Sequence, residues 1–303
     1  MNSVLEFLNV VRAYVRGVPI LDGVTFSVAE GEVVGLLGRN GSGKTTLIHI
    51  AMGMLFPQAG SVRVFGSSPN ERAVEVKKRI GYVAEEQVLP RTSSIAELIA
   101  FHRYLFRRWD DTLEREILDR FGLHTNSKIL GLSKGQARAV ALLCAVCHRP
   151  ELLVLDEPAA GLDPAARREF LEVAIQFLNC AGATILYSSH YMNDIERLGS
   201  RAVMLDGGKV RLDSTVDRLR EEYCLAVVPV HSLPDPDLLK KEPGCLGTRM
   251  YYANWHVVFQ GSPEQVKARL EQSLGSDGVR CERMNLEDFF VELLGGKQSD
   301  DLS

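Results

Sequence analysis

Residues 36–46 have a spacing that binds the phosphates of a nucleotide. Gly38, Gly43, Lys44 and Thr45 fit the pattern G-x-x-x-x-G-K-[ST], in which a glycine-rich loop joins a strand to a helix. The glycines let backbone N–H groups approach the anion, and the new helix points its positive end at it. Lys44 adds a charge for the outer phosphates, and the Thr45 hydroxyl can hold Mg²⁺. The other predicted phosphate-binding positions are Asn40, Gly41, Ser42 and Thr46.

The residues on both sides of this loop agree with that interpretation. Residues 32–37 form an apolar run typical of a buried strand, and residues 46–54 are typical of an apolar helix. The pattern therefore has the strand–loop–helix context that phosphate binding requires. A chance glycine-rich turn, the alternative, does not predict these flanks.

Two carboxylates follow a second apolar run, residues 152–155. Asp156 at the predicted strand end can hold Mg²⁺ through water. Glu157 comes one residue later and can orient or deprotonate a water that attacks the γ-phosphate. Acidic residues at a strand end are common, so this pair alone leaves a purely structural role open.

A second phosphate-binding surface is predicted between the loop and the carboxylates. Ser133, Gly135 and Gln136 lie at the start of a predicted helix that runs to about Cys147. Backbone N–H groups and the Ser133 hydroxyl at a helix N-terminus can bind an anion. A simple helix cap is the alternative, since serine and glycine suit that role.

The bulk composition is that of an ordinary globular protein. The chain has 303 residues, of which 46% are hydrophobic and 24% charged, and a net charge of −4. This length favours two structural units, and the mildly acidic balance argues against a dedicated nucleic-acid binder. Because no apolar run approaches the ~20 residues that span a bilayer, and the N-terminus lacks a signal-peptide pattern, we expect a cytoplasmic chain.

Cys144, Cys147 and His148 fit the haem-attachment pattern C-x-x-C-H. Attachment requires an export route, which the sequence does not indicate. The residues lie in an apolar helical run, where small thiols pack well in a core. We favour this core interpretation over a zinc or redox site.

The order of predicted elements divides the chain. Strands and helices alternate over residues 1–220, which predicts an α/β fold with a largely parallel sheet and a helical insertion at about 86–148. Residues 221–303 predict a small α+β domain. Within it, a proline-rich loop follows the first strand, a helix starts after the Ser262 cap and runs to about Leu274, and a last helix starts at Asn285.

Taken together, these motifs resemble the ATP-binding subunit of ABC transporters over about residues 4–220. Residues 38–45 resemble the Walker A motif, 132–136 the signature motif, 152–157 Walker B and 160–163 the D-loop. His190 is similar to the family's switch histidine, and Tyr14 lies where the family stacks an aromatic ring on adenine. A buried histidine at a strand end and a core tyrosine are the respective alternatives.

Four positions depart from the family pattern. One is Ala160, which replaces the common serine of the D-loop. Another is the family's glutamine, for which Gln87 is the alternative register to Glu85. Glu85 stands where the family has a glutamine; its carboxylate can still reach Mg²⁺ but adds negative charge beside the phosphates. Lys134 replaces a signature glycine, and Ala139 replaces a downstream arginine. Because Lys44, Asp156, Glu157 and His190 all remain, we expect competent ATP hydrolysis.

The resemblance implies a P-loop ATPase of ABC type, with a mostly parallel core sheet, an antiparallel β subdomain and a helical subdomain. It implies two such subunits, identical or different, that clasp ATP and Mg²⁺ head to tail, so that Ser133 and Gly135 of one face the phosphates on Lys44 of the other. A polytopic membrane subunit would dock at about residues 85–120 and hold the chain on the inner face of the cell membrane. The exporter type of bacterial drug, antibiotic and polysaccharide transporters is the most similar.

Two other classes of function remain open. A soluble ABC-type ATPase that acts on ribosomes or DNA usually carries two motif sets or a coiled-coil insertion, and this chain has neither. A regulatory ATP binder without hydrolysis is disfavoured by the intact Asp156 and Glu157.

Overall fold

The computed structural model describes residues 3–290 except 72, 87, 192–193, 197–200, 234, 275–277 and 285–288, and does not describe the side chains of 176–181 and 274. It divides into two compact units. The first comprises Met1–His190 and Arg197–Asp213, and the second comprises Tyr191–Glu196 and Ser214–Ser303.

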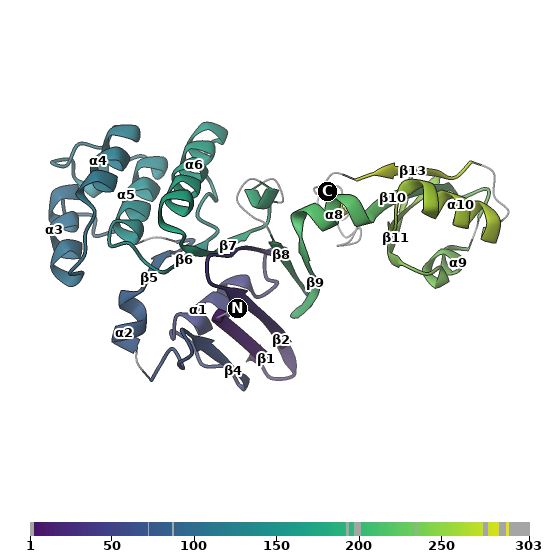
Figure 1. The fold of residues 1–303 in the computed structure, drawn as a ribbon, viewed down its shortest axis with the longest axis horizontal. Coiled ribbons are helices and arrows are strands. Elements are labelled where there is room, and N and C mark those ends of the chain that lie inside the picture. The colour runs from purple at the N-terminus through teal and green to yellow at the C-terminus, as the bar shows by residue number, and fades with distance from the viewer. Residues whose placement is uncertain are drawn as a thin grey trace. The chain divides into compact units, whose positions relative to one another are not determined.

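A six-stranded sheet forms the centre of the first unit, in the order β5-β6-β7-β3-β8-β9 (Figure 1). The neighbours from β5 to β8 pair in parallel, so their carboxyl ends meet at one edge. Their residues are nearly continuous apolar runs because both faces of the sheet are covered. The strands are β3 Val33–Leu37, β5 Ile80–Val83, β6 Leu152–Asp156, β7 Thr184–Ser189, β8 Arg201–Asp206 and β9 Lys209–Thr215.

A three-stranded antiparallel sheet in the order β2-β1-β4 packs against the same core. Its strands are β1 Ser3–Val15, β2 Val18–Ala29 and β4 Ala59–Val64. Buried residues of this sheet share one apolar cluster with α1 (Lys44–Ala51), α2 (Ala73–Lys78) and the central sheet. This cluster fixes the loop between β3 and α1, where the phosphate-binding pattern lies.

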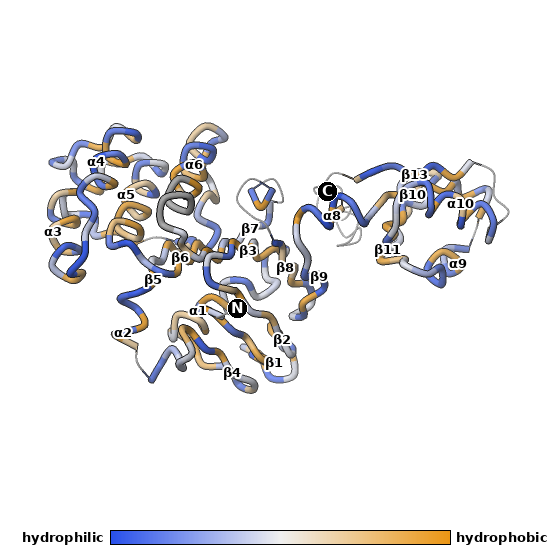
Figure 2. Tube along the Cα trace, viewed as in Figure 1, coloured by the Kyte–Doolittle hydropathy of each residue, from blue (hydrophilic) through white to orange (hydrophobic). Residues whose placement is uncertain are grey.

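The helical insertion comprises α3 (Ile95–Leu105), α4 (Asp111–Arg120), a 3-10 turn η1 (Ile129–Gly131) and α5 (Lys134–Val146). Ser94 and Ser133 each form a capping box with a residue three positions later, so the sequence defines where α3 and α5 start. Figure 2 shows hydrophobic residues along α5, whose second half is buried. After β6, α6 (Pro164–Ala181) begins at a proline.

The core interpretation of the cysteine pair is confirmed. Cys144 and Cys147 are buried on α5, and burial raises the pKa of both thiols. His148 is also buried and stacks on Phe106 with ring centroids 4.0 Å apart. Within the described part of the chain, no group of three or more histidines, cysteines or acids is placed to hold a metal ion.

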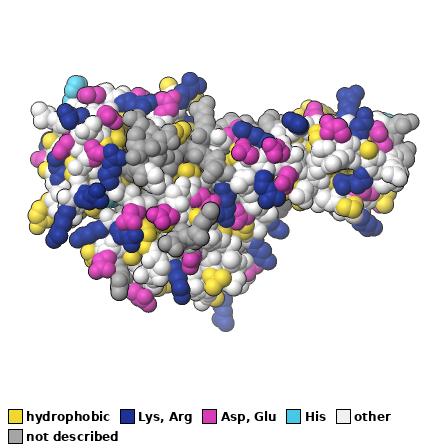
Figure 3. Space-filling view, viewed as in Figure 1, with side chains coloured by type: hydrophobic (Ala, Val, Ile, Leu, Met, Phe, Trp, Pro, Cys, Tyr) yellow, Lys and Arg dark blue, Asp and Glu magenta, His cyan; other side chains and the backbone are white. Residues whose placement is uncertain are grey.

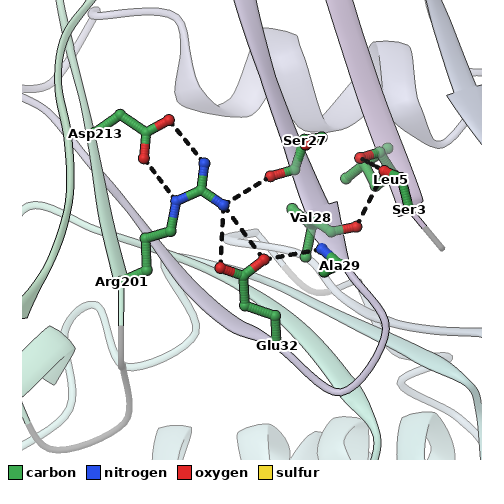
Figure 4. A network of polar contacts seen from close by, with 8 residues as sticks. All are labelled: Ser3, Leu5, Ser27, Val28, Ala29, Glu32, Arg201 and Asp213. Carbon is green, nitrogen blue, oxygen red and sulfur yellow. Dashed lines mark hydrogen bonds and ion pairs between the residues drawn. The ribbon is translucent and has the colours of Figure 1, made fainter. Parts of the chain in front are cut away.

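Arg201 ties the end of the central sheet to the antiparallel sheet. Its guanidinium bonds both Asp213 carboxylate oxygens, at 2.6 and 2.7 Å, and reaches a Glu32 oxygen at 3.0 Å (Figure 4). The same group donates to the Ser27 carbonyl at 3.0 Å. These contacts raise the pKa of Arg201 and link β8, β9 and the turn before β3.

The second unit has a βαββαβ order and a sheet in the order β11-β12-β10-β13, which is the ferredoxin-like arrangement. The helix after Ser262 is confirmed, whereas the proline-rich loop prediction is wrong in part. Residues 236–241 form a short helix because Asp235 caps it and Pro236 suits its first turn. The predicted last helix lies outside the described residues apart from 289–290. The elements are α8 Val216–Glu222, β10 Tyr223–Pro229, α9 Pro236–Lys241, β11 Cys245–Tyr251, β12 Asn254–Gln260, α10 Pro263–Leu274 and β13 Arg280–Arg283.

Among the described helices, none combines the length and apolar character needed to cross a membrane. Basic and acidic side chains are mixed over the face drawn in Figure 3.

Candidate functional site

The phosphate-binding loop connects β3 to α1 in a shape that requires glycine. Gly43 has φ +101°, and a side chain there would meet the Ile20 carbonyl oxygen at 2.8 Å. At Gly38 an added Cβ would lie 2.3 Å from Ser42 Oγ. The first turn of α1 has neither an acidic residue nor a side-chain cap, so its N–H groups remain available to an anion.

A cavity of about 440 Å³ opens at this loop. The loop residues Asn40–Thr46 line it together with Tyr14 and Ile20 from the antiparallel sheet. Glu85, just after β5, and Glu157, just after β6, also line it. The fold therefore brings together predicted site residues from four separate segments.

Lys44 and Glu157 meet in this cavity as a buried ion pair. Lys44 Nζ lies 3.1 Å from Glu157 Oε1 and donates to the Gly38 carbonyl at 2.7 Å. Only 5% of Lys44 and of Glu157 is exposed. Glu157 has φ +42°, which is uncommon for a residue other than glycine. This backbone conformation turns the Glu157 carboxylate, one residue after Asp156, toward the phosphate-binding loop.

A chain of polar contacts continues across the strand ends. The Thr45 hydroxyl lies 3.3 Å from Asp156 Oδ1, and the Ser188 hydroxyl donates to the same oxygen at 2.7 Å. The Glu157 backbone N–H donates to Ser188 Oγ at 2.9 Å. His190 Nδ1 lies 2.8 Å from Glu157 Oε2. Thr45, Asp156, Glu157 and His190 thus share one connected network.

Burial governs the protonation of Asp156. Its side chain is fully buried, and desolvation raises the pKa of its carboxyl group, against hydrogen bonds from Ser188 and Thr45 that lower it. Its Oδ2 atom is buried and makes no hydrogen bond within the described residues. Such an oxygen is normally satisfied by a partner, so this one is available to a cation.

Tyr14 is 62% exposed, which excludes the core-packing alternative. Its hydroxyl lies 3.2 Å from Thr46 Oγ1, so the ring stands beside the start of α1. A flat exposed aromatic beside a phosphate site suits a nucleobase.

Ser133, Gly135 and Gln136 lie outside the lining of this cavity. Ser133 Oγ accepts from the Gln136 N–H at 3.2 Å, and Gln136 Oε1 accepts from the Ser133 N–H at 3.2 Å. The structure therefore places them at an exposed helix N-terminus and not beside the phosphate-binding loop of their own chain.

Sequence reasoning missed Arg138 and gave Ser188 no role of its own. Arg138, on α5, is half-buried and donates to the carbonyls of Ala84 and Glu85. It thereby fixes the segment that carries Glu85 into the cavity. The sequence did contain a signal for Arg138. The resemblance predicts an arginine at position 139, and Arg138 stands one position earlier on the same helix.

The fold and this site define a P-loop ATPase of ABC type. A family model described as "ABC transporter" matches residues 21–160. The chain belongs to the ABC transporter family as an ATP-binding subunit, and such subunits are ATPases. The predictions of family, fold class and ATPase activity are confirmed.

Two curated relatives are similar over nearly their whole length. The Nod factor export ATP-binding protein I of Burkholderia thailandensis is 33% identical over 290 residues, which are 93% of this chain and 94% of that protein. Its counterpart in Burkholderia lata is 31% identical over 98% of both chains. A solved ATP-binding subunit of an ABC transporter is 28% identical, with a TM-score of 0.64 over 72% of this chain and 92% of that one. The relatives' names agree with the predicted exporter type.

Proposed function

We propose that this chain is the motor subunit of an exporter and that Lys44, Glu157 and His190 carry the hydrolysis of ATP. The observation that carries this proposal is the buried Lys44–Glu157 pair, a phosphate-binding cation 3.1 Å from a carboxylate in one cavity. Lys44 binds the outer phosphates, Glu157 orients or deprotonates the attacking water, and His190 holds Glu157 in place.

Thr45 and Asp156 would hold Mg²⁺. The unsatisfied Asp156 Oδ2 and the nearby Thr45 hydroxyl fit this ion, because Mg²⁺ prefers oxygen ligands. Bound there, Mg²⁺ supplies positive charge to the phosphate oxygens. Glu85 lines the same cavity as Glu157, and we propose that its carboxylate faces the ion.

The remaining predicted residues contact either the adenine base or the ATP that a second subunit binds. Tyr14 stacks on adenine, supported by its exposed ring beside Thr46. Ser133, Gly135 and Gln136 serve the ATP bound by a second subunit, identical or different, which agrees with their absence from the cavity of their own chain. One chain has one such motif set, so both ATP sites require two chains.

A membrane subunit docks on the helical insertion. Large apolar side chains stand exposed there: Val88, Phe101 and Tyr104 are 88%, 56% and 87% exposed. Beside them lies a mostly apolar cavity of about 210 Å³, lined by Leu89, Leu105 and Phe106 among others. Exposed apolar patches of this kind mark interaction sites. Docking here holds the chain on the inner face of the membrane.

We infer the direction of transport from the names of the relatives. Both curated relatives carry the words Nod factor export in their names, and we extend export, but not a named substrate, to this chain.

A capture experiment tests the proposed function. Tagged Glu157→Gln protein with ATP is used to purify partners from detergent-solubilised membranes, beside a matched Phe101→Asp/Tyr104→Asp variant. We expect a polytopic membrane protein in near-equal amount, and its loss from the matched variant. Only soluble partners, with no membrane protein, would overturn the transporter assignment and favour an ATPase that acts on ribosomes or DNA.

A further inference from the structure

Two cysteines of the C-terminal unit lie on neighbouring strands and face the same core. β13 pairs with β10 at one edge of the sheet, in a register that sets Cys281 opposite Ala226 (Figure 1). Cys224 lies two residues before Ala226 on β10, so Cys224 and Cys281 are diagonal neighbours on one face of the sheet. Cys224 is fully buried in the apolar cluster of this unit, whereas Cys281 packs against that cluster and is partly exposed.

The two thiols differ in reactivity because they interact with each other. The Cys224 thiol donates a hydrogen bond to the Cys281 sulfur, which raises the pKa of Cys224 and lowers the pKa of Cys281. The thiolate, and not the thiol, is the nucleophile in cysteine chemistry. Cys281 is therefore the reactive member of the pair, and Cys224 holds its proton beside it.

Arg269, on α10, brings a positive charge to this pair. Its guanidinium carbon lies 5.5 Å from the ring centroid of Phe259, which is the partner of Cys224 on β12. The Arg269 Nε and Nη2 atoms are buried and have no hydrogen-bond acceptor among the described residues. Buried donors of this kind normally have an acceptor. A neutral thiol is a weak acceptor, whereas a Cys281 thiolate supplies the negative charge that this guanidinium lacks.

The other charged groups around the pair oppose one another. Lys267 favours the thiolate of Cys281, Glu271 disfavours it, and Glu264 disfavours ionisation of the neighbouring buried thiol. Lys267 and Glu271 lie 3.8 Å apart as an exposed ion pair one helical turn apart on α10, so their effects on the cysteines largely cancel. Arg269 is therefore the cation that distinguishes this site.

We propose that Cys281 is an oxidation site, at which a hydroperoxide converts Cys281 and Cys224 into a reversible disulfide. The Cys281 thiolate attacks one peroxide oxygen, the O–O bond breaks, and the other oxygen takes up a proton and leaves as an alcohol or as water. The product is a sulfenic acid. The Cys224 sulfur then displaces the sulfenic oxygen, which leaves as water with the Cys224 proton, and the S–S bond forms. The two thiols lose the two electrons that the peroxide gains.

The sheet geometry makes this disulfide a labile one. Diagonal neighbours on antiparallel strands lie about 7–8 Å apart, whereas most disulfides join Cα atoms less than about 7 Å apart. β13 therefore has to move toward β10 when the bond forms, which it can do because β10 is its one neighbour in the described sheet. Strained disulfides are easily reduced and suit regulation better than structural support. This inference does not rest on the proposed function.

Peptide mapping of the oxidised full chain tests the proposal. The chain is treated with hydrogen peroxide, its remaining thiols are alkylated, and the digested peptides are identified by mass spectrometry. We expect a linked Cys224–Cys281 peptide pair that has lost one hydrogen from each thiol. Cys245 is the internal control, because it packs against the same core but lies two strands away from Cys224, beyond the reach of a disulfide. The absence of the linked pair, or an equal amount of a pair that contains Cys245, overturns the proposal.

Serine variants separate the two chemical steps. In Cys224→Ser the oxidation should stop at the Cys281 sulfenic acid, which dimedone traps as a stable adduct. In Cys281→Ser the remaining Cys224 should stay unmodified at the same peroxide concentration. Oxidation of Cys224 in the Cys281→Ser variant would overturn the assignment of Cys281 as the reactive thiol.

Arg269→Gln tests the source of the reactivity in the Cys224→Ser background. Dimedone labelling of Cys281 should slow about tenfold, because a smaller fraction of the thiol is ionised without the guanidinium. Arg280→Gln is the matched control, because Arg280 is exposed and lies on the opposite face of β13 from Cys281. Circular dichroism confirms that each variant is folded. An unchanged labelling rate in the folded Arg269→Gln chain overturns the proposed thiolate site.

Discussion

Lys44 and Glu157 form a buried ion pair, with Nζ 3.1 Å from Oε1 and both side chains almost fully buried. Lys44, the proposed phosphate-binding cation, is thus paired with Glu157, the proposed base that activates water. ATP must replace this contact when it binds, because its phosphates and Glu157 compete for the same ammonium group.

Glu157→Gln should separate binding from hydrolysis. The amide removes the charge that competes for Lys44, so ATP affinity should stay equal or rise, while turnover falls more than about 100-fold through loss of the base. Nucleotide binding and phosphate release measure the two effects. Glu151→Gln, a paired acid outside the cavity, is the control. Turnover within threefold of the parent would contradict the role of Glu157.

Lys44→Met should destabilise the folded chain as well as abolish ATP binding. It leaves Glu157 buried and charged without its cation, and breaking a buried pair in this way costs about 3–5 kcal/mol. In the Lys44→Met/Glu157→Gln double variant no such charge remains, so most of the lost stability should return. Denaturant unfolding of all four proteins measures this coupling. If the two single substitutions lower the free energy of unfolding additively in the double variant, the Lys44–Glu157 pair contributes no coupling energy.

Much of the candidate site was predictable because its signals are local. The phosphate-binding loop, the two carboxylates and His190 each follow a strand whose apolar run is plain in the sequence. Parallel strands then bring their carboxyl ends to one edge, so residues 44, 156, 157 and 190 had to converge. Their convergence in the structure agrees with that reasoning.

The contacts between segments were not predictable in the same way. Ser188 joins Asp156 to the Glu157 backbone, and Arg138 reaches two carbonyls of the segment after β5. The Ser188 contacts depend on the register of β6 against β7, and the Arg138 contacts depend on how α5 packs. No periodicity in the sequence encodes either. The short helix α9 was missed because proline normally indicates a loop, although Asp235 before Pro236 is also a helix start.

Tyr14 offers a test of base recognition. Tyr14→Ala should weaken ATP binding by about 1–3 kcal/mol, the range of one aromatic stacking on a base. Tyr14→Phe keeps the ring and loses only the hydroxyl contact to Thr46, so its affinity should be close to that of the parent. Calorimetric titration with ATP compares the three proteins. Equal losses in both variants would assign the effect to the hydroxyl and not to stacking.

Asp156→Asn should raise stability while it removes activity. Burial raises the pKa of Asp156, so the folded chain holds this proton more tightly than the unfolded chain. The free energy of unfolding therefore falls as the pH rises from the ordinary aspartate pKa through the raised value. At pH 7 the neutral amide side chain avoids the cost of burying a charge, and its oxygen still accepts a hydrogen bond from the Ser188 hydroxyl.

Thermal unfolding without nucleotide between pH 4 and pH 8 checks this prediction. The Tm advantage of Asp156→Asn should grow with pH, and its Mg²⁺-dependent hydrolysis should fall more than about 100-fold. A lower Tm for the variant at pH 7 would mean that the ionised carboxylate stabilises the empty site.

Arg138 should set the rate of hydrolysis without touching the nucleotide. Its planar guanidinium holds the Ala84 and Glu85 carbonyls together, which a single ammonium group does not reproduce. Arg138→Ala and Arg138→Lys should therefore both lower kcat by about 10–100-fold, the usual cost of losing a group that orients a metal site. The KM for ATP should change little, because Lys44 and the loop are intact.

The Mg²⁺ dependence distinguishes this positioning role from general destabilisation. If Arg138 acts by holding Glu85 at the cavity, its variants should need more Mg²⁺ for half-maximal rate, and Glu85→Gln should remove that difference. Arg115→Ala, an exposed arginine on α4 that bonds only its own helix among the described residues, is the control. An Arg138→Ala variant with the Mg²⁺ profile of Arg115→Ala would show that Arg138 only packs α5 against the sheet.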